Sequence, residues 1–161
     1  MTDQKLTPPS KKWNITLRKL LSESTGVKPS SICKGWQMEG LASLNEFISF
    51  NLSRQTMLGR PYDLNAQFNN WYNLEYIVSI YGLSAFDKAR MLIEFVNRQA
   101  AKDILYPVGM SFQSGFVIAD FTEKINGRAY NRTDVDLTFS AYLSVKDTKT
   151  IETLNINFIE G

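Results

Sequence analysis

The sequence contains no histidine among its 161 residues. Histidine is the side chain that most readily exchanges protons near neutral pH, and it is the commonest metal ligand in proteins. Its absence excludes Ser-His-Asp catalysis, Cys-His catalysis and histidine-based zinc sites. The Walker phosphate loop and the Gly-x-Gly-x-x-Gly nucleotide motif are also missing from the sequence. We therefore predict that the protein is not an enzyme and binds neither a cofactor nor a metal ion.

Cysteine is almost as scarce, because Cys33 is the only one in the chain. A single cysteine cannot form an intramolecular disulfide, and it has no C-x-x-C partner for zinc or redox chemistry. Free cysteine usually packs as a small apolar side chain. We expect Cys33 to be buried or half-buried, in a protein of a reducing compartment.

Long apolar runs and an excess of one charge are missing too. No uninterrupted apolar stretch approaches the roughly 20 residues that span a bilayer, and the N-terminal residues lack the apolar core of a signal peptide. We therefore expect no membrane partner and no export. The net charge is only +2, from 18 basic and 16 acidic residues, so bulk charge does not select nucleic acid as a partner.

The chain does contain enough apolar material for one core. Hydrophobic residues make up 43% of it, including ten phenylalanines and seven tyrosines, and at this length they predict a single domain. Residues 1–12 are polar and basic and include Pro8 and Pro9, so they cannot bury enough apolar surface to offset the entropy of ordering. The predicted organisation is a flexible basic arm over residues 1–12, which leaves weak DNA contact open, and one domain over residues 13–161.

Hydrophobic spacing predicts two helices. Apolar residues recur at helical spacing from Trp13 until Gly26, where glycine is a natural stop. The stronger amphipathic pattern covers residues 85–102, and its apolar face consists of Phe86, Ala89, Ile93, Val96 and Ala100. The sequence thus predicts one long amphipathic helix with a shorter N-terminal helix packed on it, and a loop over residues 30–40.

Strand patterns cover most of the remaining chain. Period-two alternation predicts strands near residues 48–53, over 72–81 and over 130–145. Residues 110–121 suit a strand pair or one bulged strand, and the Asn126-Gly127 dipeptide favours a tight hairpin turn. Residues 146–150 are predicted to form a second turn, followed by a last strand with alternating apolar residues Leu154, Ile156 and Phe158. The fold class predicted from these patterns is α+β, a single domain with a mostly antiparallel sheet.

Asp134 and Asp136 form the polar pair that first suggests a site. Residues two apart on a strand point to the same face, and paired carboxylates can hold a metal ion or transfer protons. Arg128 and Arg132 lie close by in the sequence, so we favour a mixed-charge face that is solvated or pairs across a subunit boundary. The rest of this strand face has hydroxyl side chains, which suit either a wet subunit contact or an ordinary exposed sheet.

Several segments of the second half of the chain follow one another in a recognisable order. They are the strand LEYIVSIYG, the helix FDKARMLIEFV, the stretch DFTEKINGRAYNRTDVDLTF and a closing hairpin that ends in ETLNINFIEG. In this order residues 73–161 resemble the neck-terminator (tail-terminator) proteins of tailed bacteriophages. The resemblance implies a virion protein of the neck or tail, assembled in the host cytoplasm into a ring of six subunits that caps the tail tube and joins it to the head connector. It also implies that the partners are further copies of the chain, the tube and the connector, with no catalysis.

On this resemblance, the charged residues of the long strand become candidates for subunit contact. They are Arg128, Arg132, Asp134 and Asp136 as an ion-pairing strip, with Lys146 and Lys149 at the hairpin tip. Ion pairs across a rim select partner and register more than they add affinity. Two other interpretations stay open. One is another phage tail or connector protein, such as a tube or head-completion subunit, and the other is a nucleic-acid-binding accessory protein that uses the basic arm.

Overall fold

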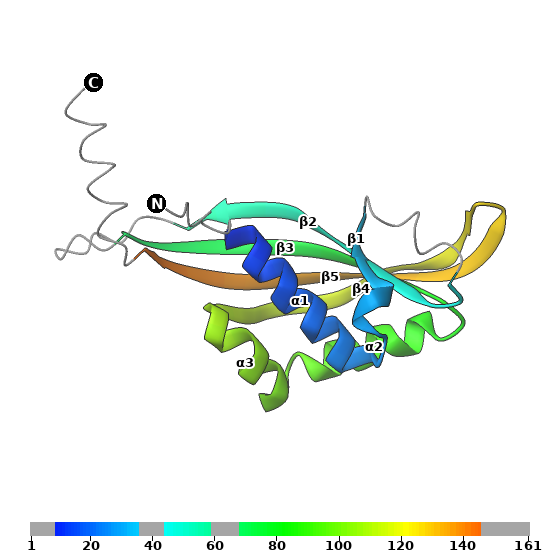
Figure 1. Ribbon diagram of the computed structural model, residues 1–161, viewed down its shortest axis with the longest axis horizontal. Coiled ribbons are helices and arrows are strands. Elements are labelled where there is room, and N and C mark those ends of the chain that lie inside the picture. Colours follow the sequence, from blue (N-terminus) through cyan, green and yellow to red (C-terminus); the bar gives the residue numbers. More distant parts are fainter. Residues whose placement is uncertain (1–8, 36–43, 59–67, 146–161) are drawn as a thin grey trace, which may run out of the picture.

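The computed structural model describes residues 9–35, 44–58 and 68–145. The elements in chain order are α1 (Pro9–Thr25), η1 (Pro29–Ser31), β1 (Ile32–Lys34), β2 (Phe47–Met57), β3 (Phe68–Tyr81), α2 (Ala85–Phe95), α3 (Gln99–Leu105), η3 (Tyr106–Val108), β4 (Met110–Ile125) and β5 (Arg128–Val145). The described strands form one five-stranded sheet in the order β1-β2-β3-β5-β4 (Figure 1). Only the β1–β2 pair is parallel. The α+β class and the mostly antiparallel sheet are confirmed.

Helix α1 is longer than the sequence pattern predicted. It begins at Pro9, so residues 9–12 of the predicted arm are helical, and residues 1–8 lie outside the described residues. Proline suits the first helical position because its missing N–H would have no partner there. The helix ends where predicted: Gly26 has a φ of 76°, and its N–H donates to the carbonyl of Ser22 at 3.0 Å.

The single helix predicted over residues 85–102 is two helices in the structure. The break lies at residues 96–98, where Arg98 has an extended backbone with φ −88° and ψ 161°. The Asn97 side chain donates to the carbonyl of Ile93 at 3.0 Å and so takes up one of the last carbonyls of α2. With 17 residues, α1 is the longest of the described helices. The prediction that the N-terminal helix is the shorter of the two was therefore wrong.

A short strand occupies part of the segment predicted as a loop. Residues Ile32–Lys34 form β1, which pairs with β2 so that Ile32 lies opposite Ile48. Cys33 on this strand is 6% exposed, which confirms the expectation of a buried thiol. Burial raises its pKa. Three residues are too few for periodicity to reveal a strand.

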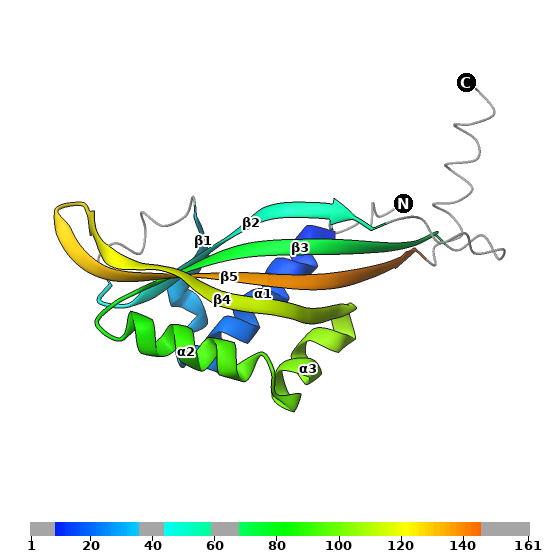
Figure 2. The same cartoon turned by 180° about the vertical axis from the view of Figure 1, so that it is seen from behind.

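The described helices cover one face of the sheet. Figures 1 and 2 view the molecule from opposite sides, with α1 in front of the strands in the first and behind them in the second. The main core joins residues of all three helices to alternate residues of the strands: Trp13, Leu17, Leu20, Leu21, Ala89, Leu92, Ala101 and Leu105 pack against Ile48, Phe50, Leu74, Tyr76, Val78, Ile80, Val135, Leu137 and Phe139. The predicted alternation of β5 between a buried face and a second face is confirmed over residues 135–141.

Strands β4 and β5 form a long hairpin. Asn126 and Gly127 have φ values of 50° and 80°, the left-handed conformation that a two-residue turn of this kind requires. The predicted choice between a strand pair and a bulged strand resolves to a bulged strand, because the β4 register shifts between Phe112 and Ser114 and again between Val117 and Ala119. The predicted turn over 146–150 and the last strand lie outside the described residues.

Candidate assembly interface

The second face of the sheet has no described helix packed on it, and we call it the open face. The register of β3 and β5 defines its central residues as Trp71, Asn73, Glu75 and Ile77 on β3 with Asp136, Thr138, Ser140 and Tyr142 on β5. Trp71 is 43% exposed, and its ring lies 4.9 Å from that of Tyr142. The open face therefore combines hydroxyl and amide groups with an aromatic pair, the exposed Trp71 and the half-buried Tyr142, a composition typical of specific protein contacts.

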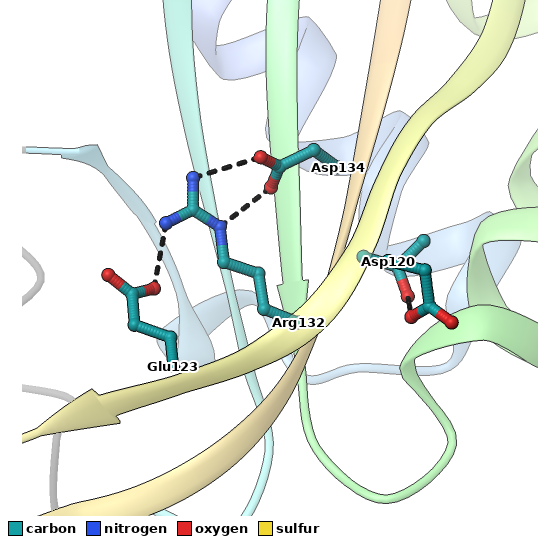
Figure 3. Close-up of polar contacts among 5 residues, drawn as sticks. Asp120, Glu123, Arg132 and Asp134 are labelled. Atoms are coloured by element: carbon teal, nitrogen blue, oxygen red, sulfur yellow. Dashed lines mark hydrogen bonds and ion pairs between the residues drawn. The ribbon is translucent and has the colours of Figure 1, made fainter.

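Arg132 is the centre of a polar cluster at one end of the open face. Its Nε and Nη2 atoms donate to the two carboxylate oxygens of Asp134 at 2.8 and 3.0 Å, and its Nη1 donates to Glu123 at 2.7 Å (Figure 3). The guanidinium also lies over the rings of Tyr81 and Phe121, 5.5 and 5.0 Å from their centroids. Two carboxylates and two rings thus fix the position of one guanidinium.

This cluster is largely shielded from water. The side chains of Arg132, Asp134 and Glu123 are 22%, 11% and 31% exposed. Burial alone lowers the pKa of Arg132, but the hydrogen bonds that its guanidinium donates to Asp134 and Glu123 outweigh burial and raise the pKa above its ordinary value. The arginine is a permanent cation that pairs within its own chain, so Arg132 and Asp134 contribute first to the fold of the subunit.

The remaining candidates of the strip have different surroundings. Arg128 donates to the side-chain oxygen of Asn45 and lies 5.3 Å from the ring centroid of Tyr130. Asp136 has Ile77 and Phe116 as its cross-strand neighbours, and its Oδ1 atom is buried with no hydrogen-bond partner among the described residues. Lys146 and Lys149 lie outside those residues. Among the residues of the predicted strip that the structure describes, Asp136 is the one with an unused hydrogen-bond acceptor.

Sequence reasoning placed Asp134 in one strip with Arg132 but missed the other groups that hold the guanidinium. Glu123 comes from β4, and Tyr81 comes from the end of β3, opposite Arg132 in the register. A second buried cluster surrounds this end of the sheet, with Phe47 stacked on Tyr81 at 4.4 Å and edge-on to Tyr130 at 5.4 Å. The Asn126-Gly127 turn could have predicted that Glu123 lies near Arg132, because a two-residue hairpin fixes the register of β4 against β5.

Two buried tyrosines should make the subunit less stable at high pH. Burial raises the pKa of Tyr76 and of Tyr81 above the ordinary value, and for Tyr81 the nearby Arg132 opposes that increase only in part. Above a pH of about 10, tyrosines of the unfolded chain lose protons that the folded chain retains. The free energy of unfolding should then fall as the pH rises, by about 1.4 kcal/mol per pH unit for each such tyrosine.

Denaturant titrations between pH 8 and 11 measure this dependence. Tyr81→Phe should flatten the decline, because the phenyl ring fills the same space without a titrating group. Tyr106→Phe serves as the matched variant, since Tyr106 is 56% exposed. A decline equally steep in Tyr81→Phe and in the wild-type protein would contradict the assignment.

The described residues contain no group of three or more side chains that could bind a metal ion. Among the helices described, none combines the length and the apolar character that a transmembrane span needs.

Comparison of the sequence with protein families gives a match over most of the chain. Residues 15–161 match the family described as "Phage neck terminator protein". The chain belongs to this family. Neck terminators are structural proteins, so the chain is a structural protein of the phage virion. The resemblance predicted over residues 73–161 is confirmed, and the family match extends it back to residue 15.

Two further comparisons add little to the family assignment. No curated protein matches the sequence. Among solved structures, the chain is similar to a chain of the "Virion of native gene transfer agent (GTA) particle", with 13% sequence identity and a TM-score of 0.38 over 82% of this chain and 91% of that chain. An identity and a TM-score this low support no conclusion about the function of the neck terminator described here.

Proposed function

We propose that this chain assembles in the host cytoplasm into a closed ring of six subunits, which terminates the tail tube and joins it to the head connector. The observation on which the proposal depends is the family match over residues 15–161. Its partners are further copies of itself within the ring, the end of the tube on one side and a connector protein on the other. A ring needs two different surfaces on each subunit, because head-to-tail contacts repeat around the rotation axis.

The open face is the surface that best suits one of these contacts. It places the exposed Trp71 beside the half-buried Tyr142, and no group among the described residues donates to the Oδ1 atom of Asp136. A buried oxygen of this kind costs about 1–3 kcal/mol when nothing donates to it. Asp136 as a whole residue is only half-buried, so a cationic or amide donor from a neighbouring subunit that pairs with its carboxylate would offset this cost. The proposal therefore retains Asp136 and Arg128 as contact residues, with Lys146 and Lys149 as candidates for the cation.

Imaging tests the proposed function directly. Negative-stain microscopy and native mass spectrometry of the wild-type protein, alone and mixed with phage tail tubes, should show closed rings that sit on tube ends. Open tubes built from this chain would instead identify a tube protein. A protein that stays monomeric and ignores tail tubes contradicts the proposal.

Asp136→Asn should separate assembly from folding. No group among the described residues donates to the Oδ1 atom of Asp136, so replacing the carboxylate with an amide should leave the free energy of unfolding the same or raise it. Assembly should weaken at least tenfold, which corresponds to about 1.4 kcal/mol per contact, because the donor from the neighbour loses its charged acceptor. Denaturant titration and the concentration dependence of ring formation measure the two effects.

Asp103→Asn is the matched control for this variant. Asp103 lies on α3, where its carboxylate accepts a hydrogen bond from Gln99 at 2.9 Å at an exposed position. It should leave ring formation unchanged. Rings that form equally well with Asp136→Asn and with Asp103→Asn would remove Asp136 from the interface and leave the family assignment untouched.

A further inference from the structure

Strand β4 is a long sheet edge. It is the last strand in the order β1-β2-β3-β5-β4, and among the described residues β5 is its only partner. Its outer row of backbone N–H and C=O groups is therefore available to another strand. Natural proteins usually protect such edges with charged residues, with proline or by covering them.

The middle of β4 has none of the usual charged or proline protection. Residues 110–119, MSFQSGFVIA, contain neither a charged residue nor a proline. Phe116 and Ile118 on this stretch are 52% and 48% exposed. The two register shifts beside Ser114 and Ala119 interrupt the edge without removing its apolar side chains. An uncharged, half-exposed edge strand of this length is a ready template for strand addition.

The chain itself contains a segment that fits this template. Residues 153–158, TLNINF, have no charge, and the alternation of Leu154, Ile156 and Phe158 predicts a strand. They follow β5, which already has β3 on one side and β4 on the other as far as Ala141. Among the described residues, residues 142–145 are the part of β5 with no strand partner on one side, and there the N–H of Tyr142 donates to the carbonyl of Gly109 at 2.7 Å. A full-length hairpin with β5 is therefore blocked.

The start of β4 also stands between Val145 and the β4 edge of the same subunit. Gly109 lies on the flank of β5 where β4 begins, and its carbonyl accepts the N–H of Tyr142, so a chain that turned from Val145 toward that edge would have to pass it. Fully extended, the seven residues 146–152 would span about 23–25 Å, which would allow the following segment to reach beyond its own subunit. A strand donor and an edge acceptor are also two different surfaces, which is the arrangement that a head-to-tail ring requires.

We infer that residues 153–158 of one subunit add as a sixth strand to the β4 edge of the next subunit and so close the ring. The inference rests on the proposed ring and names the contact that holds it together. Backbone hydrogen bonds to β4 supply the pairing, and the apolar residues of the donated strand cover Phe116 and Ile118.

Paired variants of the full-length chain test the inference. Ile118→Lys places a charge on the acceptor edge, and Ile156→Asp places one on the donor strand. Each variant alone should lose ring formation at concentrations where the wild-type ring is complete. Met91→Lys is the matched control, because Met91 on α2 is 48% exposed, as Ile118 is, and it should form rings normally. Thermal unfolding should show that all three variants fold.

Mixing the two defective variants identifies the chain that donates the strand. In the mixture, an intact donor from Ile118→Lys can pair with an intact edge from Ile156→Asp, but the reverse pair is blocked. Native mass spectrometry should therefore detect a one-to-one dimer and no ring. Loss of rings without a dimer in the mixture would mean that the segment binds its own subunit, and it would overturn the inference.

The remaining outcomes separate the inference from the proposed function. Normal rings from both Ile118→Lys and Ile156→Asp would overturn the strand addition and leave the ring in place. A wild-type protein that forms no rings and binds no tail tubes would overturn the proposed function, and the inference with it.

Discussion

Replacing Arg132 with methionine is expected to lower the free energy of unfolding by about 2–3 kcal/mol. Removing one partner of a buried ion pair leaves the other charge without compensation, which costs about 3–5 kcal/mol in fully buried cases. The Asp134 side chain is only 11% exposed and would lose two hydrogen bonds, and Glu123 would lose one. The lower figure reflects partial access of water to Glu123, which is 31% exposed. Denaturant titration at neutral pH measures the loss.

A surface arginine provides the comparison. Arg98 lies 4.0 Å from Glu94 on a helical turn, and the two side chains are 67% and 61% exposed. Exposed pairs of this kind contribute about 0–1 kcal/mol, so Arg98→Met should change stability little. Similar losses for the two variants would show that the Arg132 cluster is no more than a surface pair. A large loss at Arg132 alone supports its role in fixing the end of the β4–β5 hairpin.

Leu92→Ala should destabilise the subunit by about 3 kcal/mol, within the range of 2.7–5 kcal/mol known for buried leucines. Leu92 is fully buried in the main core, where α2 packs on the sheet. The substitution removes apolar contacts and leaves a cavity beneath the covered face. A shift in the denaturation midpoint with an unchanged slope would show that the loss is one of stability.

Leu83→Ala is the same chemical change at a position that is 98% exposed. Surface substitutions of this kind usually stay within about 0.5 kcal/mol. A loss at Leu83 comparable to that at Leu92 would contradict the described packing of α2. An unchanged stability with weakened binding to tail tubes or to the connector would place Leu83 in a contact with a partner.

The sequence predicted those parts of the fold that depend on local chemistry. The stop at Gly26 and the turn at Asn126-Gly127 follow from residues that accept positive φ values. The alternation along β5 follows from the different environments of the two faces of the sheet. In each case the residues that decide the structure are adjacent in the chain.

The parts that were not predicted depend on contacts between distant segments. The helical pattern of residues 85–102 continues through Arg98, where the chain breaks so that Ala101 and Leu105 can join the core. The buried face of α2 contains Ala85, Ala89 and Leu92, whereas Phe86 of the predicted face is 47% exposed. Where helix and sheet surfaces meet, tertiary packing overrides the periodic pattern.

The candidate interface shows the same division. Strand alternation predicts that Asp134 and Asp136 lie on one face, and the register confirms that they do. Which groups surround each carboxylate depends on the neighbouring strands β3 and β4. The sequence alone therefore could not show that Asp134 accepts hydrogen bonds from Arg132, whereas the Oδ1 atom of Asp136 has no donor among the described residues. The roles of these residues between subunits remain predictions.

The buried thiol on β1 makes the protein convenient for fluorescence work. Because Cys33 is 6% exposed and burial raises its pKa, little reactive thiolate is available to maleimide dyes. A cysteine introduced at an exposed site such as Met91 would therefore react almost alone, in the native background. Stepwise photobleaching of such labelled subunits on single tail tubes would then count the copies present at each neck.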